Sequence, residues 1–174
     1  MIRPRTDADL PALERAMREV HERSGYPSVW PADPRAFLAP PGTLGAWVAE
    51  VGGEVAGQVV LRPVPEEVPG WVRAAGLAAP EVAILSRLFV APVGQGRGLG
   101  RALFHAAWER ARALNRRALL DVHHRSLPAI HLYEGEGWRR VATVDGDWRE
   151  PDGSVPRVHV YVSPKPVPPE ATIS

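Results

Sequence analysis

The sequence predicts a single α/β domain in which helices pack on one mixed sheet. Two observations predict this class. Short apolar runs alternate with longer segments of helical apolar spacing in the order β-α-α-β-β-β-α-β-α-β-β, and neither a repeat nor a linker divides the 174 residues. The domain is expected to span residues 1–162, and the proline-rich segment 163–174 is expected to be a disordered tail.

Local signals predict the individual elements. The predicted strands are 2–5, 46–51, 55–61, 82–90, 118–122, 138–144 and 155–162. The predicted helices are one that begins at Thr6 or Asp7 and ends near His21, a short one from Pro34 to Leu38, one at 99–114 and one that Ser126 caps. Gly52 and Gly53 indicate a hairpin. Residues 63–80 resemble neither helix nor strand, and a connection of that length is often functional.

The composition argues against several classes of protein. A formal net charge of +1 gives no reason to expect a nucleic-acid partner. The lack of cysteine excludes disulfides, thiolate metal sites and a cysteine nucleophile. No apolar run reaches the roughly 20 residues that a membrane span needs, and the charged N-terminus lacks the apolar segment of a signal peptide. We therefore expect a soluble cytoplasmic protein with no membrane partner.

A glycine-rich segment joins the predicted strand 82–90 to the predicted helix 99–114 and has the layout of a diphosphate site. Glycines allow positive φ and a close backbone approach, and a helix N-terminus adds unpaired N–H groups. Arg97 and Arg101 add full positive charges. The dinucleotide fingerprint G-x-G-x-x-G fails because Leu99 or Arg101 stands at its third glycine, and the NTPase phosphate loop fails because no Lys-Ser/Thr pair follows. A nucleotide-binding α/β protein is therefore disfavoured.

Two motifs do match one family. The pattern Q/R-x-x-G-x-G reads Gln95-Gly96-Arg97-Gly98-Leu99-Gly100 and resembles the pyrophosphate loop of the GNAT superfamily of N-acetyltransferases. The segment Ala129-Ile130-His131-Leu132-Tyr133-Glu134-Gly135-Glu136-Gly137-Trp138 is similar to the family motif A-x-x-L-Y-x-x-x-G-F/W. The resemblance covers Ile2 to Val162 and implies a GNAT-type mixed, mostly antiparallel sheet flanked by helices. It also implies acetyl-CoA as a co-substrate, with no metal.

The resemblance assigns roles to particular residues. The backbone of Leu88, Phe89 and Val90 is expected to bind the pantetheine arm. The pyrophosphate-binding residues are expected to be Gln95, Gly96, Arg97, Gly98, Leu99, Gly100 and Arg101. Ser126 stands where the family often has an asparagine that contacts the cofactor, and the segment 63–80 is longer than the usual hairpin.

Acyl transfer to an amine needs a neutral amine, a donor for the developing oxyanion and a proton for the departing thiolate. Tyr133 matches the family tyrosine that acts as general acid toward the CoA sulfur. Glu81 is the candidate base, because it opens the strand 82–90 where some family members place a carboxylate; a solvated surface glutamate is the alternative. His123 and His124 follow a strand and face opposite ways, so at most one can point into a cleft and both cannot bind one metal.

The predicted function is N-acetyltransferase, with transfer from acetyl-CoA to a primary amine of a small molecule or peptide. The alternative is a catalytically inactive acyl-CoA-binding sensor or regulatory module. Many members of the resembled family are dimers, so a homodimer is a further expectation from the resemblance.

Overall fold

The computed structural model describes residues 1–166 as one seven-stranded sheet of order β1-β2-β3-β4-β5-β7-β6. All neighbouring strands are antiparallel except β4 and β5, which are parallel. The strands are β1 (Ile2–Pro4), β2 (Gly45–Val51), β3 (Glu54–Arg62), β4 (Val82–Val90), β5 (Arg117–His123), β6 (Arg139–Asp145) and β7 (Arg157–Val162). The predicted mixed, mostly antiparallel sheet is therefore confirmed.

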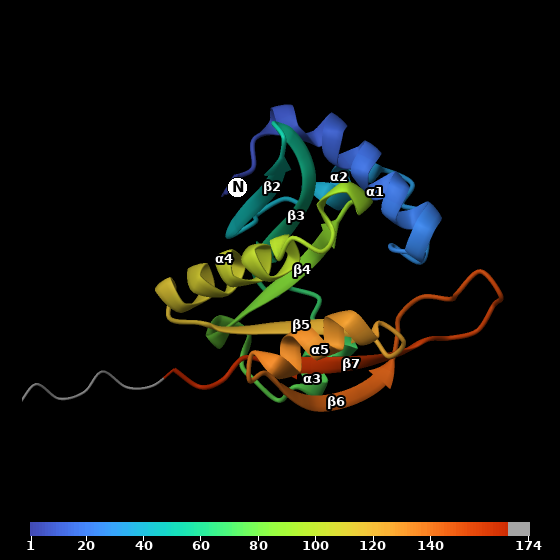
Figure 1. Ribbon diagram of the computed structural model, residues 1–174. Helices are drawn as coiled ribbons and strands as arrows, with labels where there is room; N and C mark the ends of the chain where they lie inside the picture. The colour runs from blue at the N-terminus through green and yellow to red at the C-terminus, as the bar shows by residue number, and fades with distance from the viewer. Residues whose placement is uncertain (167–174) are drawn as a thin grey trace, which may run out of the picture.

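Helices cover both faces of this sheet (Figure 1). The helices are α1 (Leu10–Ser24), α2 (Pro34–Leu38), α3 (Gly70–Ala74), α4 (Leu99–Ala113) and α5 (Leu127–Gly135), with 3-10 turns η1 (Asp7–Asp9), η2 (Ala79–Glu81) and η3 (Pro92–Gly94). Helices α4 and α5 pack on one face, around Phe104 and Tyr133. Helices α1, α2 and α3 pack on the other face, in two apolar clusters around Met17 and Val72. No helix in residues 1–166 is long and apolar enough to cross a membrane.

The element boundaries agree with the sequence prediction except at a few places. The segment 63–80, predicted as irregular, contains α3, because Val72 packs under the sheet with Ile84 and Leu119. Helix α1 extends past the predicted end near His21 and stops at Gly25, which has φ of 76°. Ser163, assigned to the tail, is buried, and its N–H and Oγ bond Ala118. The remainder of the predicted tail lies largely outside the described residues.

The middle of the sheet is where strand pairing stops. Strands β4 and β5 are joined by only three residue pairs, which end at Ile84 and Leu119. Just beyond this point β4 carries one extra residue relative to β3. Two neighbouring residue pairs are separated by two positions on β3 but by three on β4. Arg87 lies in this bulge with φ of 55°. A bulge bends its strand, so β4 diverges from β5 at the point where their pairing ends.

A buried polar contact fixes α2 over the same region. Gln58 on β3 is fully buried, and its Nε2 donates to the carbonyl of Leu38 at 3.2 Å. Arg5 donates to that carbonyl at 2.6 Å and to Gln58 Oε1 at 3.2 Å. Because buried amides are costly unless paired, this contact holds the end of α2 against the sheet and positions the preceding Phe37 beside Arg87.

Candidate active site

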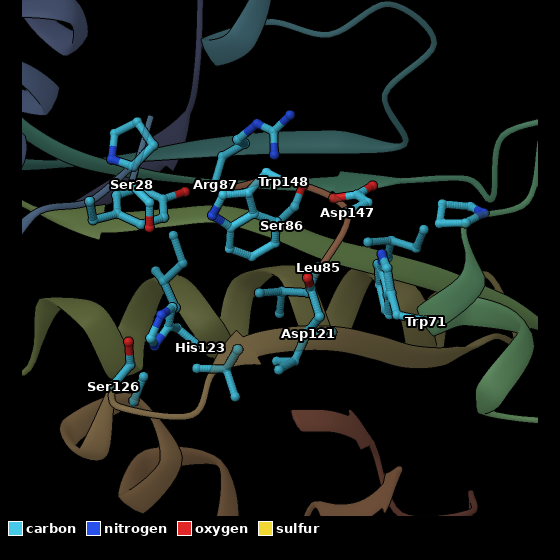
Figure 2. Close-up of a pocket in the computed structure, with 18 of the residues that line it drawn as sticks. Ser28, Trp71, Leu85, Ser86, Arg87, Asp121, His123, Ser126, Asp147 and Trp148 are labelled. Atoms are coloured by element: carbon cyan, nitrogen blue, oxygen red, sulfur yellow. The ribbon is translucent and has the colours of Figure 1, made fainter. Parts of the chain in front are cut away.

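The diverging strands β4 and β5 form the walls of a cavity of about 500 Å³. Leu85 to Leu88 of β4 and Leu120 to His123 of β5 line it where a continuous sheet would be paired. Ser126, Ala129 and Tyr133 close it on the α5 side of the sheet. On the opposite side, Figure 2 shows Trp71 of α3 and Trp148 of the β6–β7 loop projecting toward Asp121. The cavity therefore passes through the sheet from one face to the other.

Tyr133 is held rigidly with a free hydroxyl. Its ring is buried and packs against Phe104 and Tyr161, with ring centroids 5.5 and 6.0 Å away. The hydroxyl of Tyr161 donates to Glu134 at 3.0 Å, whereas that of Tyr133 bonds to no other residue in the described chain and lines the cavity. Burial raises the pKa of Tyr133 above its ordinary value, so the phenol is protonated at neutral pH. It is therefore suited to donate a proton.

Asp121 is a carboxylate that the sequence prediction missed. It lies on β5, and its side chain points into the cavity between Trp71 and Trp148 (Figure 2). Burial raises its pKa from 3.8 to about 6, with a further contribution from Asp147, while Arg87 and Arg62 lower it. Asp121 makes no ion pair within 4.0 Å in residues 1–166. A carboxylate with such a pKa is deprotonated at neutral pH and basic enough to accept a proton.

His123 also lines the cavity, but both of its ring nitrogens are occupied. Nδ1 accepts from the amide of Arg125 at 3.1 Å, so the proton lies on Nε2, which donates to Glu150 at 2.8 Å. His124 does not line the cavity, but its ring stacks on that of His123 with the centroids 4.9 Å apart. The expectation that the two side chains face opposite ways was wrong, because β5 ends at His123 and strand alternation does not continue to His124. His123 is therefore a structural contact. Two carboxylates line the cavity, Asp121 on β5 and Asp147 on the β6–β7 loop, and Asp121 is the one on a strand that borders the β4–β5 gap.

Glu81 lies away from this cavity. It ends the turn η2, one residue before β4, and is exposed. Val82 next to it pairs with Arg117 at the closed end of the β4–β5 wedge, whereas the cavity opens beyond Ile84. The structure thus does not bring Glu81 together with Tyr133, and its assignment as base stays a prediction without geometric support.

The glycine loop has the free donors that an anion requires. None of the backbone amides of residues 96–101 donates to an acceptor in the described chain. Gly96 and Gly98 have φ of 76° and 74°, a left-handed conformation that glycine adopts readily, just before the start of α4. Gly94 serves a different purpose, because a Cβ there would lie 2.9 Å from the Val90 side chain. The loop fits a diphosphate through its backbone and the N-terminus of a 15-residue helix.

The other predicted cofactor residues lie along the path from this loop to the cavity. Gln95 Nε2 donates to the carbonyl of Val90 at 3.0 Å and ties the loop to the end of β4. Leu88 lines the cavity, but the Phe89 side chain is buried on the α1 face, so only its backbone is available. Ser126 lines the cavity, and its hydroxyl makes no bond in residues 1–166.

The charges beside the loop are only partly free. Arg101 lies 3.6 Å from Glu136, and the same carboxylate lies 3.1 Å from His105. Arg97 is exposed and makes no ion pair in the described chain. Among the described residues no group of acidic, histidine or cysteine side chains is arranged to hold a metal ion.

Comparisons with known proteins agree with this geometry. Residues 10–138 match the model of the Acetyltransferase (GNAT) family. No curated protein sequence matches the chain. Among solved structures, the ribosomal-protein-S18-alanine N-acetyltransferase from Escherichia coli superposes with a TM-score of 0.71 at 20% identity, over 100% of this chain and 99% of that one. A GCN5-related N-acetyltransferase from Kribbella flavida is 27% identical, with a TM-score of 0.69 over 94% of this chain and 96% of that one.

Arabidopsis thaliana NAA60, solved in complex with acetyl-CoA, is 19% identical with a TM-score of 0.71, over 94% of this chain and 97% of that one. The fold and its cavity thus define an acyltransferase-type domain. The chain belongs to the acetyltransferase (GNAT) family, as the motifs at 95–100 and 129–138 indicated.

Proposed function

We propose that the protein transfers an acetyl group from acetyl-CoA to the primary amine of a small-molecule or peptide acceptor. One observation carries this proposal: the parting of β4 and β5 puts Tyr133 and Asp121 in the walls of the same cavity. The adjoining edge of β4 leads to the unpaired amides of residues 96–101.

The loop and β4 would bind acetyl-CoA in an extended form. The amides of residues 96–101 and the start of α4 receive the pyrophosphate, because they are donors without protein acceptors. Beyond Ile84 the edge of β4 that faces β5 has no strand partner, so its backbone is free to bond the pantetheine arm. The thioester then lies in the cavity beside Leu88 and the hydroxyl of Tyr133.

The acceptor enters from the Asp121 side as a neutral amine. Its nitrogen attacks the thioester carbonyl carbon; a C–N bond forms and the C–S bond breaks, with the electron pair leaving on sulfur. Asp121 takes the proton that the nitrogen loses, and Tyr133 gives its hydroxyl proton to the sulfur. Solvent returns one proton from Asp121 to Tyr133, so the products are the N-acetylated amine and CoA thiol, with both side chains restored.

The test is release of CoA thiol from acetyl-CoA over a panel of amines that includes amino acids, polyamines and peptides. Thiol release that depends on one amine, with mass-spectrometric detection of its acetylated form, is the expected result. Calorimetric binding of CoA without thiol release on any amine would instead indicate a binding or regulatory module.

A further inference from the structure

The cavity contains a cation that has no partner within residues 1–166. Arg62, at the end of β3, lines it, yet its guanidinium makes no hydrogen bond or ion pair in residues 1–166. Its Nε is buried and unpaired. Burial lowers the pKa of Arg62, but a guanidinium keeps its charge at neutral pH. Because a charge that is partly removed from water and has no partner is costly, this arginine is expected to meet an anion that residues 1–166 do not supply.

A second arginine lines the same cavity and is held in place. Arg87, in the β4 bulge, has its guanidinium carbon 3.8 Å from the Phe37 ring centroid, and its Nε donates to the Phe37 carbonyl at 3.1 Å. These contacts fix the guanidinium plane and leave its terminal nitrogens without a carboxylate in the described chain. Burial and the positive charge of Arg87 both lower the pKa of Arg62. The two guanidinium groups therefore interact electrostatically.

The carboxylate of Asp121 forms no ion pair with Arg62 or with Arg87. Asp121 acts electrostatically on Arg62 and on Arg87, but it lies more than the 4.0 Å of an ion pair from each of them. Two neutral donors in the same lining are also buried and unpaired, the Ser86 hydroxyl and the Trp148 indole N–H. The lining thus contains unpaired donors and two arginines, together with two carboxylates, Asp121 and Asp147, neither of which lies within 4.0 Å of either guanidinium.

We propose that the acceptor is an amino acid, with its carboxylate bound by Arg62 and Arg87 and its amine directed at Asp121. This inference rests on the proposed transferase function and narrows its substrate class. A zwitterion supplies an anion for the unpaired guanidinium and an amine for the carboxylate, which no neutral amine or polyamine does. A cavity of about 500 Å³ is within the range of small-molecule sites. A peptide N-terminus has an amide in place of the carboxylate and would leave Arg62 unpaired.

The experiment compares matched pairs of acceptors, each common amino acid and its C-terminal amide, in the thiol-release assay. Wild type is expected to acetylate the free acid with kcat/KM at least about tenfold above that of the amide, since a charged, paired contact is worth about that much. Arg62→Met keeps much of the side-chain volume and should lower kcat/KM for the acid about tenfold or more, leaving the amide within about twofold. Arg73→Met, which removes an exposed charge from α3 outside the cavity, is the control and should change neither.

Equal turnover of acids and amides by wild type would overturn the proposal, as would an equal loss for both in Arg62→Met. The acid-to-amide ratio of wild type needs no variant, so a folding defect in Arg62→Met does not obscure the result. If no amino acid and no amino-acid amide causes thiol release, the proposed transferase function fails for amino-acid acceptors. Calorimetric titration of the same pairs into the CoA-saturated protein then tests separately whether Arg62 and Arg87 bind a carboxylate. Tighter binding of the acids than of the amides supports that site, and equal binding refutes it.

Discussion

His123, which lines the cavity at the end of β5, donates from Nε2 to Glu150 at 2.8 Å. Glu150 belongs to the β6–β7 loop, which projects beyond the ends of β6 and β7 in Figure 1 and also carries Asp147 and Trp148. Both members of the pair are largely buried. This hydrogen bond is a specific tie between the loop that walls the cavity and the strand that carries Asp121.

Replacement of Glu150 by alanine should therefore loosen that wall. We expect Glu150→Ala to raise KM for the acceptor several-fold, because Trp148 is no longer held over the cavity, and to leave KM for acetyl-CoA within about twofold. Steady-state kinetics with each substrate varied in turn measures both constants. Asp152→Ala, in the same loop but not in contact with β5, is the matched control. A rise in KM for acetyl-CoA alone would place the loop on the cofactor side.

Asp121→Asn tests the base. With a pKa of about 6 in the free protein, Asp121 should give wild type an acid limb in kcat/KM, with activity falling about tenfold per pH unit below that value. The asparagine variant should lose about 10²-fold or more in kcat at neutral pH and lack this limb. If instead Glu81→Gln removes the limb and Asp121→Asn keeps it, the base is Glu81.

The same variant should be more stable than wild type. Because burial raises the Asp121 pKa from 3.8 to about 6, the folded state binds more protons than the unfolded state in that interval, and wild-type stability falls as pH rises through it. The raised pKa lowers the free energy of unfolding by at most about 3 kcal/mol at neutral pH, and access of water through the cavity makes this loss smaller. Denaturant unfolding at acidic and neutral pH should show a fall in wild type and a smaller one in Asp121→Asn. An equal fall in wild type and Asp121→Asn would assign the pH dependence of stability to other ionisable groups.

Tyr133→Phe removes one hydroxyl that has no protein partner and keeps a well-packed ring. We expect little change in melting temperature, KM for acetyl-CoA within about threefold, and kcat lower by about 10². The loss falls at the low end of general-acid effects, since a CoA thiolate is already a fair leaving group. Single-turnover kinetics should confirm that chemistry limits the rate. A kcat within about twofold of wild type would give Tyr133 a packing role, with water as the proton donor.

Gly98→Val should abolish CoA binding by placing a branched side chain where the pyrophosphate meets the helix start. Gly98 has φ of 74°, so any side chain also adds backbone strain of roughly 1–2 kcal/mol. Gly42→Val is matched for that strain, because Gly42 has φ of 72° and likewise has no atom within 4 Å of an added Cβ. Both variants should lose similar stability, but only Gly98→Val should lose CoA affinity, by at least about tenfold in calorimetry. Equal CoA affinities would reject this loop as the pyrophosphate site.

The parts of the structure that depend on local signals were predictable from sequence. Strand 82–90 was predicted at its observed limits, and the helix after the glycines was placed within one residue. Helix α3 was missed because its five residues are surrounded by proline and glycine and are stabilised by Val72 packing under the sheet. Packing of that kind joins residues far apart in sequence and leaves no local periodicity.

The positions of the glycine loop before α4 and of Tyr133 in the cavity wall were likewise predictable, because both lie in contiguous motifs. The convergence of Arg62, Asp121 and Trp148 on that cavity was not, since they come from three separate elements. A signal for Asp121 was present: it is a lone charge within the apolar strand Ala118 to Val122, and a charge there needs a reason. Which cavity it faces depends on the strand register, which one sequence does not reveal.

Because only three residue pairs join β4 to β5, the sheet has two inner strand edges in addition to its two outer ones. Beyond Ile84 and Leu119, each strand is paired on one side only, with β3 and β7 respectively. Unpaired strand edges usually attract other chains and cause aggregation. Here they face each other across the cavity, which residues of α5 and the β6–β7 loop also line. In the proposed reaction the main chain of the sheet would thus itself form part of the substrate-binding surface.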